Sequence, residues 1–231
     1  MILFDAVPQI VQQIFKAHGT KHHFVRHQHI CTTGEAATHL YFVEKGRIAI
    51  TKESVGGKEL TLCIATKNDC IGESILFTPL ITYPLSAKVL DCCTVFAISK
   101  EQLEHELSEN LAALRECLTW IQIQRMREQT KLRDLLLYGK KGALSSTLIR
   151  LANSYGEKKT DKSIQISEKF THSELASLCA TSREVVNRLL QEFKKEKVIS
   201  EENGYLTIYR LDYLQQFCEC EQCVEFLCRI N

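Results

Sequence analysis

Residues 170–199 read FTHSELASLCATSREVVNRLLQEFKKEKVI, and this stretch decides the fold of the C-terminal part of the chain. Thr171 followed by Glu174 forms a capping box, which predicts the start of a first helix. A second helix is predicted to begin at Thr181 or Ser182, because Ser, Arg and Glu suit a first helical turn. The stretch therefore indicates a helix, a short turn and a second helix.

A β-hairpin is predicted directly after this pair of helices. The dipeptide Asn203-Gly204 separates the runs VIS and YLTIY. Asn-Gly is the strongest short signal for a two-residue hairpin turn. Two helices followed by a hairpin in this order indicate a winged helix-turn-helix, which is a DNA-binding fold.

The second helix carries the side chains that are expected to read DNA. Ser182 lies at the start of this helix. One face of the helix after it carries Arg183, Glu184, Asn187 and Arg188. Arginine donates two hydrogen bonds to guanine and glutamate accepts from the cytosine amino group, so this set suits the major groove. The alternative is an ordinary solvated charged face, and the ordered series of motifs makes it the less favoured interpretation.

A different pattern precedes this region. Residues 22–98 show short alternating apolar runs separated by turns such as Lys45-Gly46, which predicts a small antiparallel sandwich or barrel. Residues 100–137 contain neither Gly nor Pro, and their leucines recur at threes and fours, which predicts one long helix. One small sandwich cannot cover both faces of such a helix. We therefore expect a homodimer, with a helix packed only on its own domain as the alternative.

Length and composition limit the classes of protein. A chain of 231 residues with 45% apolar residues favours two domains, and its formal net charge of +1 does not by itself indicate a nucleic-acid partner. No apolar run approaches the ~20 residues of a membrane helix. The start, MILFDAVPQIVQQIF, lacks the basic segment of a secretory signal, so a cytoplasmic protein is expected. No catalytic constellation is evident, and no enzyme is predicted.

Four cysteines crowd the C-terminal tail CECEQCVEFLCRIN, at Cys218, Cys220, Cys223 and Cys228. A C-x2-C pair followed by a third cysteine is typical of thiolates that hold an iron–sulfur cluster or a structural zinc ion. Incidental or disulfide-forming thiols are less favoured in a chain without a secretory signal. The spacing does not choose between iron–sulfur and zinc.

Several motifs together resemble the Crp/Fnr family of bacterial transcription regulators. YFVEKGRIAI, GGKELTL, KNDCIGESILF, LSAKVL and VFAIS resemble the cyclic-nucleotide-binding roll of that family, and SREVVNRLL resembles its recognition helix. The resemblance implies an α+β fold with a β-roll over 1–100, a dimerisation helix over 101–138, a winged helix-turn-helix over 139–217 and a cysteine-rich cluster-binding tail over 218–231. It also implies a homodimer that binds a TGTGA-like palindrome in double-stranded DNA and works with RNA polymerase.

The nucleotide pocket of that family uses a Gly-Glu pair and a later Arg-Ser or Arg-Thr that binds the cyclic phosphate. Gly72 and Glu73 match the first element, but the second reads Leu85-Ser86-Ala87. A leucine cannot neutralise a buried phosphate, and an unpaired buried anion is costly. We therefore expect the roll to be a scaffold that binds no cyclic AMP.

The tail is similar to that of the oxygen-sensing Fnr branch of the family in Gram-positive bacilli. That branch carries a C-terminal C-x2-C-x4-C, as at Cys220, Cys223 and Cys228. The resemblance implies a 4Fe–4S cluster held by these three cysteines and by an aspartate at the end of the dimer helix, which is Asp134 here. The alternative for Asp134 is a helix-surface salt bridge with Lys131.

Three hypotheses remain from the sequence. The first is an oxygen-responsive regulator of anaerobic gene expression that reads DNA when its cluster is intact and loses the DNA-competent geometry when oxygen destroys the cluster. Nearby Lys131, Arg133, Lys140 and Lys141 are expected to stabilise the negative cluster, and Cys218 is the alternative fourth ligand. The second hypothesis places zinc or a thiol–disulfide switch in the tail, and the third is a small-molecule sensor that uses the roll.

Overall fold

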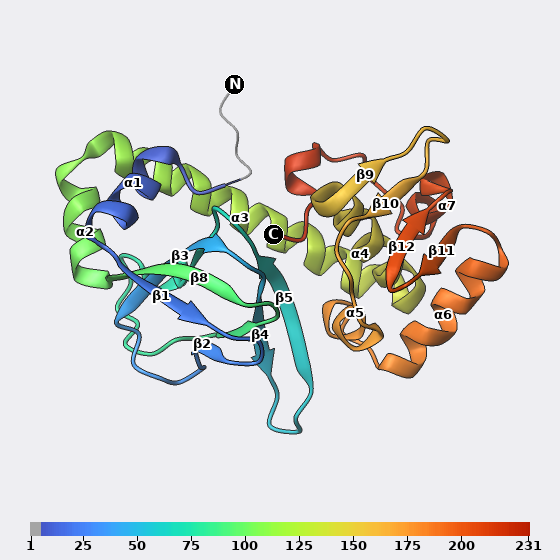
Figure 1. Cartoon of the computed structure of the whole chain (residues 1–231), viewed down its shortest axis with the longest axis horizontal. Coiled ribbons are helices and arrows are strands. Elements are labelled where there is room, and N and C mark those ends of the chain that lie inside the picture. The colour runs from blue at the N-terminus through green and yellow to red at the C-terminus, as the bar shows by residue number, and fades with distance from the viewer. Residues whose placement is uncertain (1–5) are drawn as a thin grey trace. The chain divides into compact units, whose positions relative to one another are not determined.

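A computed structural model describes residues 6–231 and shows two compact units (Figure 1). One unit comprises most of the chain up to Arg125, and the other comprises Met126–Ile230 together with Lys58–Thr61. Within residues 6–231, no helix combines the length and the apolarity needed to cross a membrane. The start of the chain, where the sequence predicts no secretory signal, lies partly outside the described residues.

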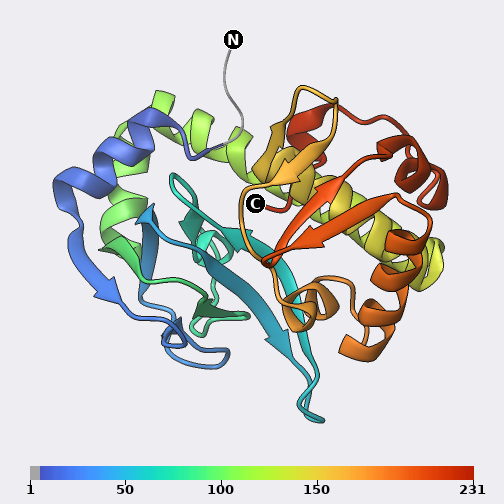
Figure 2. The same cartoon turned by 45° about the vertical axis from the view of Figure 1, so that its right-hand side comes forward.

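The N-terminal part is built from two four-stranded sheets with the orders β1-β8-β3-β6 and β2-β7-β4-β5 (Figures 1 and 2). The helices α1 (Gln9–His18) and η1 (Glu73–Ile75) accompany them. The strands are β1 (Thr20–Phe24), β2 (His29–Cys31), β3 (His39–Lys45), β4 (Ile48–Glu53), β5 (Glu59–Ala65), β6 (Cys70–Ile71), β7 (Ser86–Val89) and β8 (Cys93–Ser99). Side chains from both sheets form one apolar core, as the alternating sequence predicts.

The turn between β3 and β4 lies where the sequence places it. Gly46 has a φ of 102°, and a Cβ built on it would lie 2.5 Å from the Cβ of Cys93. Only glycine combines a left-handed backbone with so close an approach of a neighbouring strand. The core beside this turn contains Val43, Ile48 and Val95, which are fully buried.

The prediction of a single long helix over residues 100–137 is wrong in one respect, because the structure has two helices there, separated at Asn110. Helix α2 (Lys100–Glu109) ends there, and α3 (Leu111–Leu137) follows. Asn110 has an extended backbone with φ −126° and ψ 91°, and its side-chain oxygen accepts from the amide of Ala113 at 3.1 Å. Asparagine is a strong N-cap, so it starts a new helix without any Gly or Pro.

The break divides the leucines of the predicted stripe between two environments. Leu103 and Leu107 of α2 are buried in the core of the roll. Leu111, Leu118 and Leu132 of α3 are exposed and recur at multiples of seven residues. Exposed apolar side chains at heptad spacing are typical of a helix that pairs with a second helix.

The second unit contains a winged helix-turn-helix. Its sheet has the order β11-β12-β10-β9. Its elements are α4 (Gly139–Tyr155), β9 (Gly156–Lys158), β10 (Ile164–Ile166), α5 (His172–Leu178), α6 (Arg183–Lys195), β11 (Ile199–Glu202), β12 (Tyr205–Ile208), α7 (Leu211–Phe217) and η2 (Glu225–Leu227). Asn203 and Gly204 between β11 and β12 have φ values of 53° and 83°, the positive pair that a type I′ turn requires. The predicted α+β fold with roll, long helix and winged helix-turn-helix is confirmed.

Candidate nucleic-acid interface and cluster site

Helices α5 and α6 form the helix-turn-helix. The predicted capping box is present at the start of α5, where the Thr171 side chain accepts from the amide of Glu174 and the Glu174 side chain accepts from the amide of Thr171. At the start of α6 the Ser182 hydroxyl accepts from the amide of Val185. The opposite face of α6 is buried through Val186, Leu189, Leu190 and Phe193. Local capping and the burial of this stripe therefore fix the two helices.

The outer face of α6 is exposed along its first two turns, at Ser182, Arg183, Glu184, Asn187 and Arg188. Within residues 6–231, neither Arg183 nor Arg188 forms a salt bridge. The Ser182 hydroxyl lowers the pKa of Glu184, which keeps this carboxylate an acceptor. The structure thus presents two arginine donors and one acceptor together on an open surface, which suits the edges of base pairs.

Two lysines at the start of α4 contact the helix-turn-helix. Lys140 donates to the backbone oxygen of Ala180 in the turn at 3.0 Å, and Ala180 has a φ of 49°. Lys141 donates to Glu192 of α6 at 2.5 Å, and its ammonium lies 3.9 Å from the ring centre of Phe217. The sequence predicts these lysines beside the cluster, whereas the structure directs them to the turn, to α6 and to α7. Only their basic charge could be read from the sequence.

The first tail cysteine belongs to the end of α7. Cys218 is buried, and its Sγ donates to the backbone oxygens of Leu214 and Gln215, both at 3.6 Å. Burial raises the pKa of the Cys218 thiol to about 12. Through these two contacts the buried Cys218 thiol caps the end of α7. This geometry disfavours Cys218 as the fourth ligand.

The other three tail cysteines are partly exposed and lie in the part of the second unit that also holds Asp134. Burial raises the pKa of Cys228, Arg150 opposes this rise, and Cys223, Cys220 and Asp134 add to it. These electrostatic influences place Cys220, Cys223 and Asp134 in the surroundings of Cys228. Arg133 bonds to Asp134 and to Glu221 of the tail, and Arg150 bonds to Asp134 and to the backbone of Leu227, so the structure places the four residues in one region of the second unit.

Asp134 is buried, and both of its oxygens accept hydrogen bonds. Its Oδ1 accepts from Nε and Nη2 of Arg133, at 3.0 and 2.7 Å. Its Oδ2 accepts from the Ser146 hydroxyl and from Nη2 of Arg150, the latter at 2.8 Å. The alternative of a helix-surface salt bridge with Lys131 is wrong, because the carboxylate is only 4% exposed and is paired with two arginines.

The tail is fastened to α3 and α4 mainly through its backbone. Arg127 of α3 donates to the backbone oxygen of Phe226 at 2.6 Å. Asn153 of α4 donates to the backbone oxygen of Cys228 at 2.7 Å. Arg133, which holds Asp134, also forms a salt bridge with Glu221 of the tail. The chain from Cys220 to Cys228 is therefore attached to α3 and α4 at Glu221, Phe226 and Cys228.

The residues fit the group that the resemblance implies. Among residues 6–231, no three His, Cys, Asp or Glu side chains are already gathered around the position of a single metal ion. A 4Fe–4S cluster takes one ligand on each of four irons, so its ligands stand further apart than those of one ion. Arg133 and Arg150 each bond to Asp134 and to the tail that carries the three thiols, and they supply positive charge there. Donor chemistry and charge both suit an anionic cluster.

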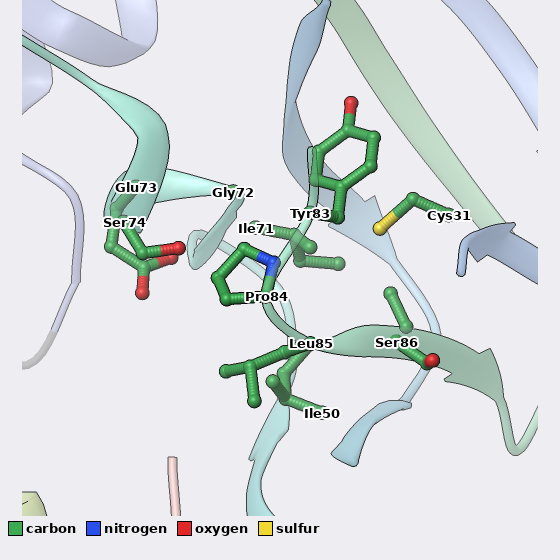
Figure 3. Close-up of a pocket in the computed structure, with 11 residues that line it drawn as sticks. Cys31, Ile50, Ile71, Gly72, Glu73, Ser74, Tyr83, Pro84, Leu85 and Ser86 are labelled. Atoms are coloured by element: carbon green, nitrogen blue, oxygen red, sulfur yellow. The ribbon is translucent and has the colours of Figure 1, made fainter. Parts of the chain in front are cut away.

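The roll contains a pocket at the place of the family's nucleotide site (Figure 3). Pro84, Leu85, Ile50 and Ile71 line it, and Figure 3 shows Leu85 next to Ile50, with Glu73 and Ser74 together at the left. In the part of the chain that the structure describes, its lining includes no Lys or Arg. The described lining therefore offers no cationic side chain to a cyclic phosphate.

Comparisons with known proteins agree with this architecture. Residues 21–110 match the family model for a cyclic nucleotide-binding domain, and residues 142–217 match that for a Crp-like helix-turn-helix domain. The anaerobic regulatory protein of Bacillus subtilis is 42% identical over 98% of this chain and 95% of its own length. The cAMP-activated regulator CRP of Escherichia coli is 25% identical over 84% of this chain and 92% of its own.

The fold also matches a solved structure. The regulator CLP of Xanthomonas campestris superposes with a TM-score of 0.76 at 21% identity, covering 87% of this chain and 99% of that one. The structural match shows the fold, and the two family models together with the Bacillus subtilis relative show the family. The chain belongs to the Crp/Fnr family of DNA-binding transcription regulators, whose members bind DNA as dimers and are not enzymes.

Proposed function

We propose that this regulator responds to oxygen and controls anaerobic gene expression. In this proposal a 4Fe–4S cluster is held by Cys220, Cys223, Cys228 and Asp134, and the homodimer binds a TGTGA-like palindrome while the cluster is intact. The observation that carries the proposal is the buried carboxylate of Asp134, which pairs with Arg133 and Arg150, the same two arginines that bond to the cysteine tail. The name of the relative from Bacillus subtilis, an anaerobic regulatory protein, supports it further.

The chain's own residues provide the charge balance at this site. Three thiolates and one carboxylate around a core of charge +2 give a net charge of −2, which would be costly to bury alone. Arg133 and Arg150 offset this charge from α3 and α4. The cluster itself would supply the reactivity toward oxygen. A carboxylate ligand holds iron less firmly than a thiolate, so the iron bound by Asp134 would be the most labile of the cluster.

A continuous series of contacts connects the site with the recognition helix within the second unit. Asp134 bonds to Arg150 of α4, and the start of the same helix bonds through Lys141 to Glu192 of α6. Phe217, which packs against Lys141, directly precedes the cysteine tail. A change in how firmly the tail is bound can therefore shift α6, since the tail and α6 share packed neighbours.

DNA reading requires two copies of α6 in a defined geometry. Recognition helices that read a palindrome lie about 34 Å apart, which is one turn of DNA. The exposed leucines of α3 provide the apolar face for pairing two copies. Bound in this way at a promoter, the dimer would act on RNA polymerase. We propose no role for cyclic AMP, because Leu85 stands where the resemblance implies the phosphate-binding arginine, and the described lining of the pocket contains no other Arg or Lys.

The metal content of protein purified without oxygen tests the proposal. We expect brown protein with about four irons and four sulfides per chain, and we expect the colour to bleach in air. A colourless protein with one zinc per chain would replace the cluster with a structural zinc site. A colourless protein without metal would point to the thiols alone.

A further inference from the structure

Arg150 is the largest fully buried side chain among residues 6–231, with 1% exposure. Arginine stays charged in proteins, so each of its five N–H groups needs an acceptor when it is buried. Every one of the five has an acceptor within 3.5 Å: Asp134 Oδ2 at 2.8 Å, Thr130 Oγ1 at 3.2 Å, Leu227 O at 3.2 Å, Ser146 Oγ at 3.3 Å and Arg229 O at 3.5 Å. So complete a set fixes the guanidinium in one orientation.

Two of these acceptors lie on either side of a tail cysteine. Leu227 and Arg229 are the chain neighbours of Cys228, and one Nη1 group of Arg150 donates to the backbone oxygens of both. Asn153, three residues further along α4, donates to the backbone oxygen of Cys228 itself at 2.7 Å. With three successive carbonyls held, the peptide planes around Cys228 are fixed, and so is the direction of its Cα–Cβ bond.

The other Nη group of Arg150 holds Asp134. We propose that Arg150 is a positioning residue that sets Cys228 and Asp134 at the spacing of two cluster ligands before a cluster is bound. That these two residues are ligands rests on the proposed function. The spacing is a property of the chain and can be measured without a cluster.

The chemistry of arginine explains why this position needs it. A planar guanidinium holds its N–H groups in fixed directions. Here Nη2 donates to the carboxylate of Asp134, and Nη1 donates to the two backbone carbonyls. A lysine keeps the charge, but its donors radiate from a single nitrogen and cannot span both groups. Arg150→Lys therefore separates the geometry of this residue from its charge.

The first test uses cluster-free protein and the rate at which iodoacetamide alkylates Cys228, measured by mass spectrometry of the tail peptide. The exposed Cys92, far from α4 in the sequence, serves as internal reference. We expect Arg150→Lys to raise the ratio of the Cys228 rate to the Cys92 rate about tenfold, because hydrogen bonds from a charged group to two carbonyls are lost. An unchanged ratio in the folded variant would overturn the proposal.

A second variant keeps the test decisive if Arg150→Lys does not fold. Thr130→Val removes one acceptor of Arg150 with almost no change in shape, and we expect it to raise the same ratio about threefold. If Arg150→Lys fails to fold and Thr130→Val leaves the ratio unchanged, the proposal is overturned.

A second readout distinguishes positioning from mere support of the fold. The half-life of the cluster under a fixed concentration of chelator is compared, without oxygen, in wild type, Arg150→Lys, Asp134→Asn and the double variant. We expect Arg150→Lys to shorten the half-life about tenfold in the wild-type background and much less beside Asp134→Asn, because the two residues act together. Equal factors in both backgrounds would mean that Arg150 only supports the fold.

The outcomes also separate this inference from the proposed function. A wild-type chain that takes up no iron and sulfide without oxygen overturns the proposed function. A wild type that carries the cluster, with Arg150→Lys unchanged in both the alkylation ratio and the half-life, overturns the role of Arg150 alone. Asn153→Ala is the matched control, since it loosens the tail and leaves the pair of Arg150 and Asp134 intact.

Discussion

Asp134→Ala should lose its iron and sulfide and should also unfold more easily as cluster-free protein. The cluster would lose its carboxylate ligand, and the buried guanidinium of Arg150 would lose its counter-charge. Removing one partner of a buried ion pair costs about 3–5 kcal/mol of the free energy of unfolding. Urea unfolding of the cluster-free protein measures this loss, and iron and sulfide analysis of anaerobic protein measures the cluster.

Two cysteine variants provide matched controls for this prediction. Cys220→Ser should abolish the cluster with little effect on the stability of cluster-free protein, because Cys220 is partly exposed. Cys218→Ser, two residues away, should keep the cluster, since Cys218 caps α7 within the core. If Asp134→Ala retained iron and sulfide while Cys218→Ser lost them, the cluster would be held by four cysteines.

Arg188→Ala should abolish specific DNA binding and leave the cluster and the dimer intact. Arg188 is exposed on the outer face of α6, away from the buried face of the helix. A bidentate contact to guanine supplies about 1–3 kcal/mol of discrimination, and a dimer loses it twice, so specific affinity should fall about 30-fold or more. The measurement is the ratio of dissociation constants for a TGTGA palindrome and for a scrambled duplex, at one salt concentration.

The exposed Lys195 at the end of α6 provides the control for charge alone. Lys195→Ala should weaken binding to both duplexes by a similar factor, as the loss of a phosphate contact does. If Arg188→Ala left the ratio of dissociation constants as in wild type, a different face of the chain would read the bases.

The sequence predicted the winged helix-turn-helix well because its signals are local. The capping box of Thr171 and Glu174 and the turn at Asn203-Gly204 each depend on residues within three positions of one another. Periodicity was less reliable over residues 100–137. The leucine pattern continues across Asn110, and the break depends on a side-chain cap that has no Gly or Pro to announce it.

The surroundings of the cluster site could not be predicted, because they depend on contacts between distant residues. Asp134 is paired with Arg150, sixteen residues away, and Arg150 in turn bonds to the tail, more than seventy residues away. Nothing in the spacing of the sequence marks such a buried pair. The basic charges of Lys140 and Lys141 were visible, but only the fold shows that they contact Ala180 and the side chains near α6.

The central claim is that oxygen controls DNA binding through the tail. The most direct test measures the affinity of one anaerobic sample for the TGTGA palindrome by fluorescence anisotropy, before and after a measured exposure to air, while absorbance follows the cluster. The account predicts tight binding at first and a loss of affinity that proceeds in step with the bleaching of the cluster. Equal affinity before and after complete bleaching would contradict it.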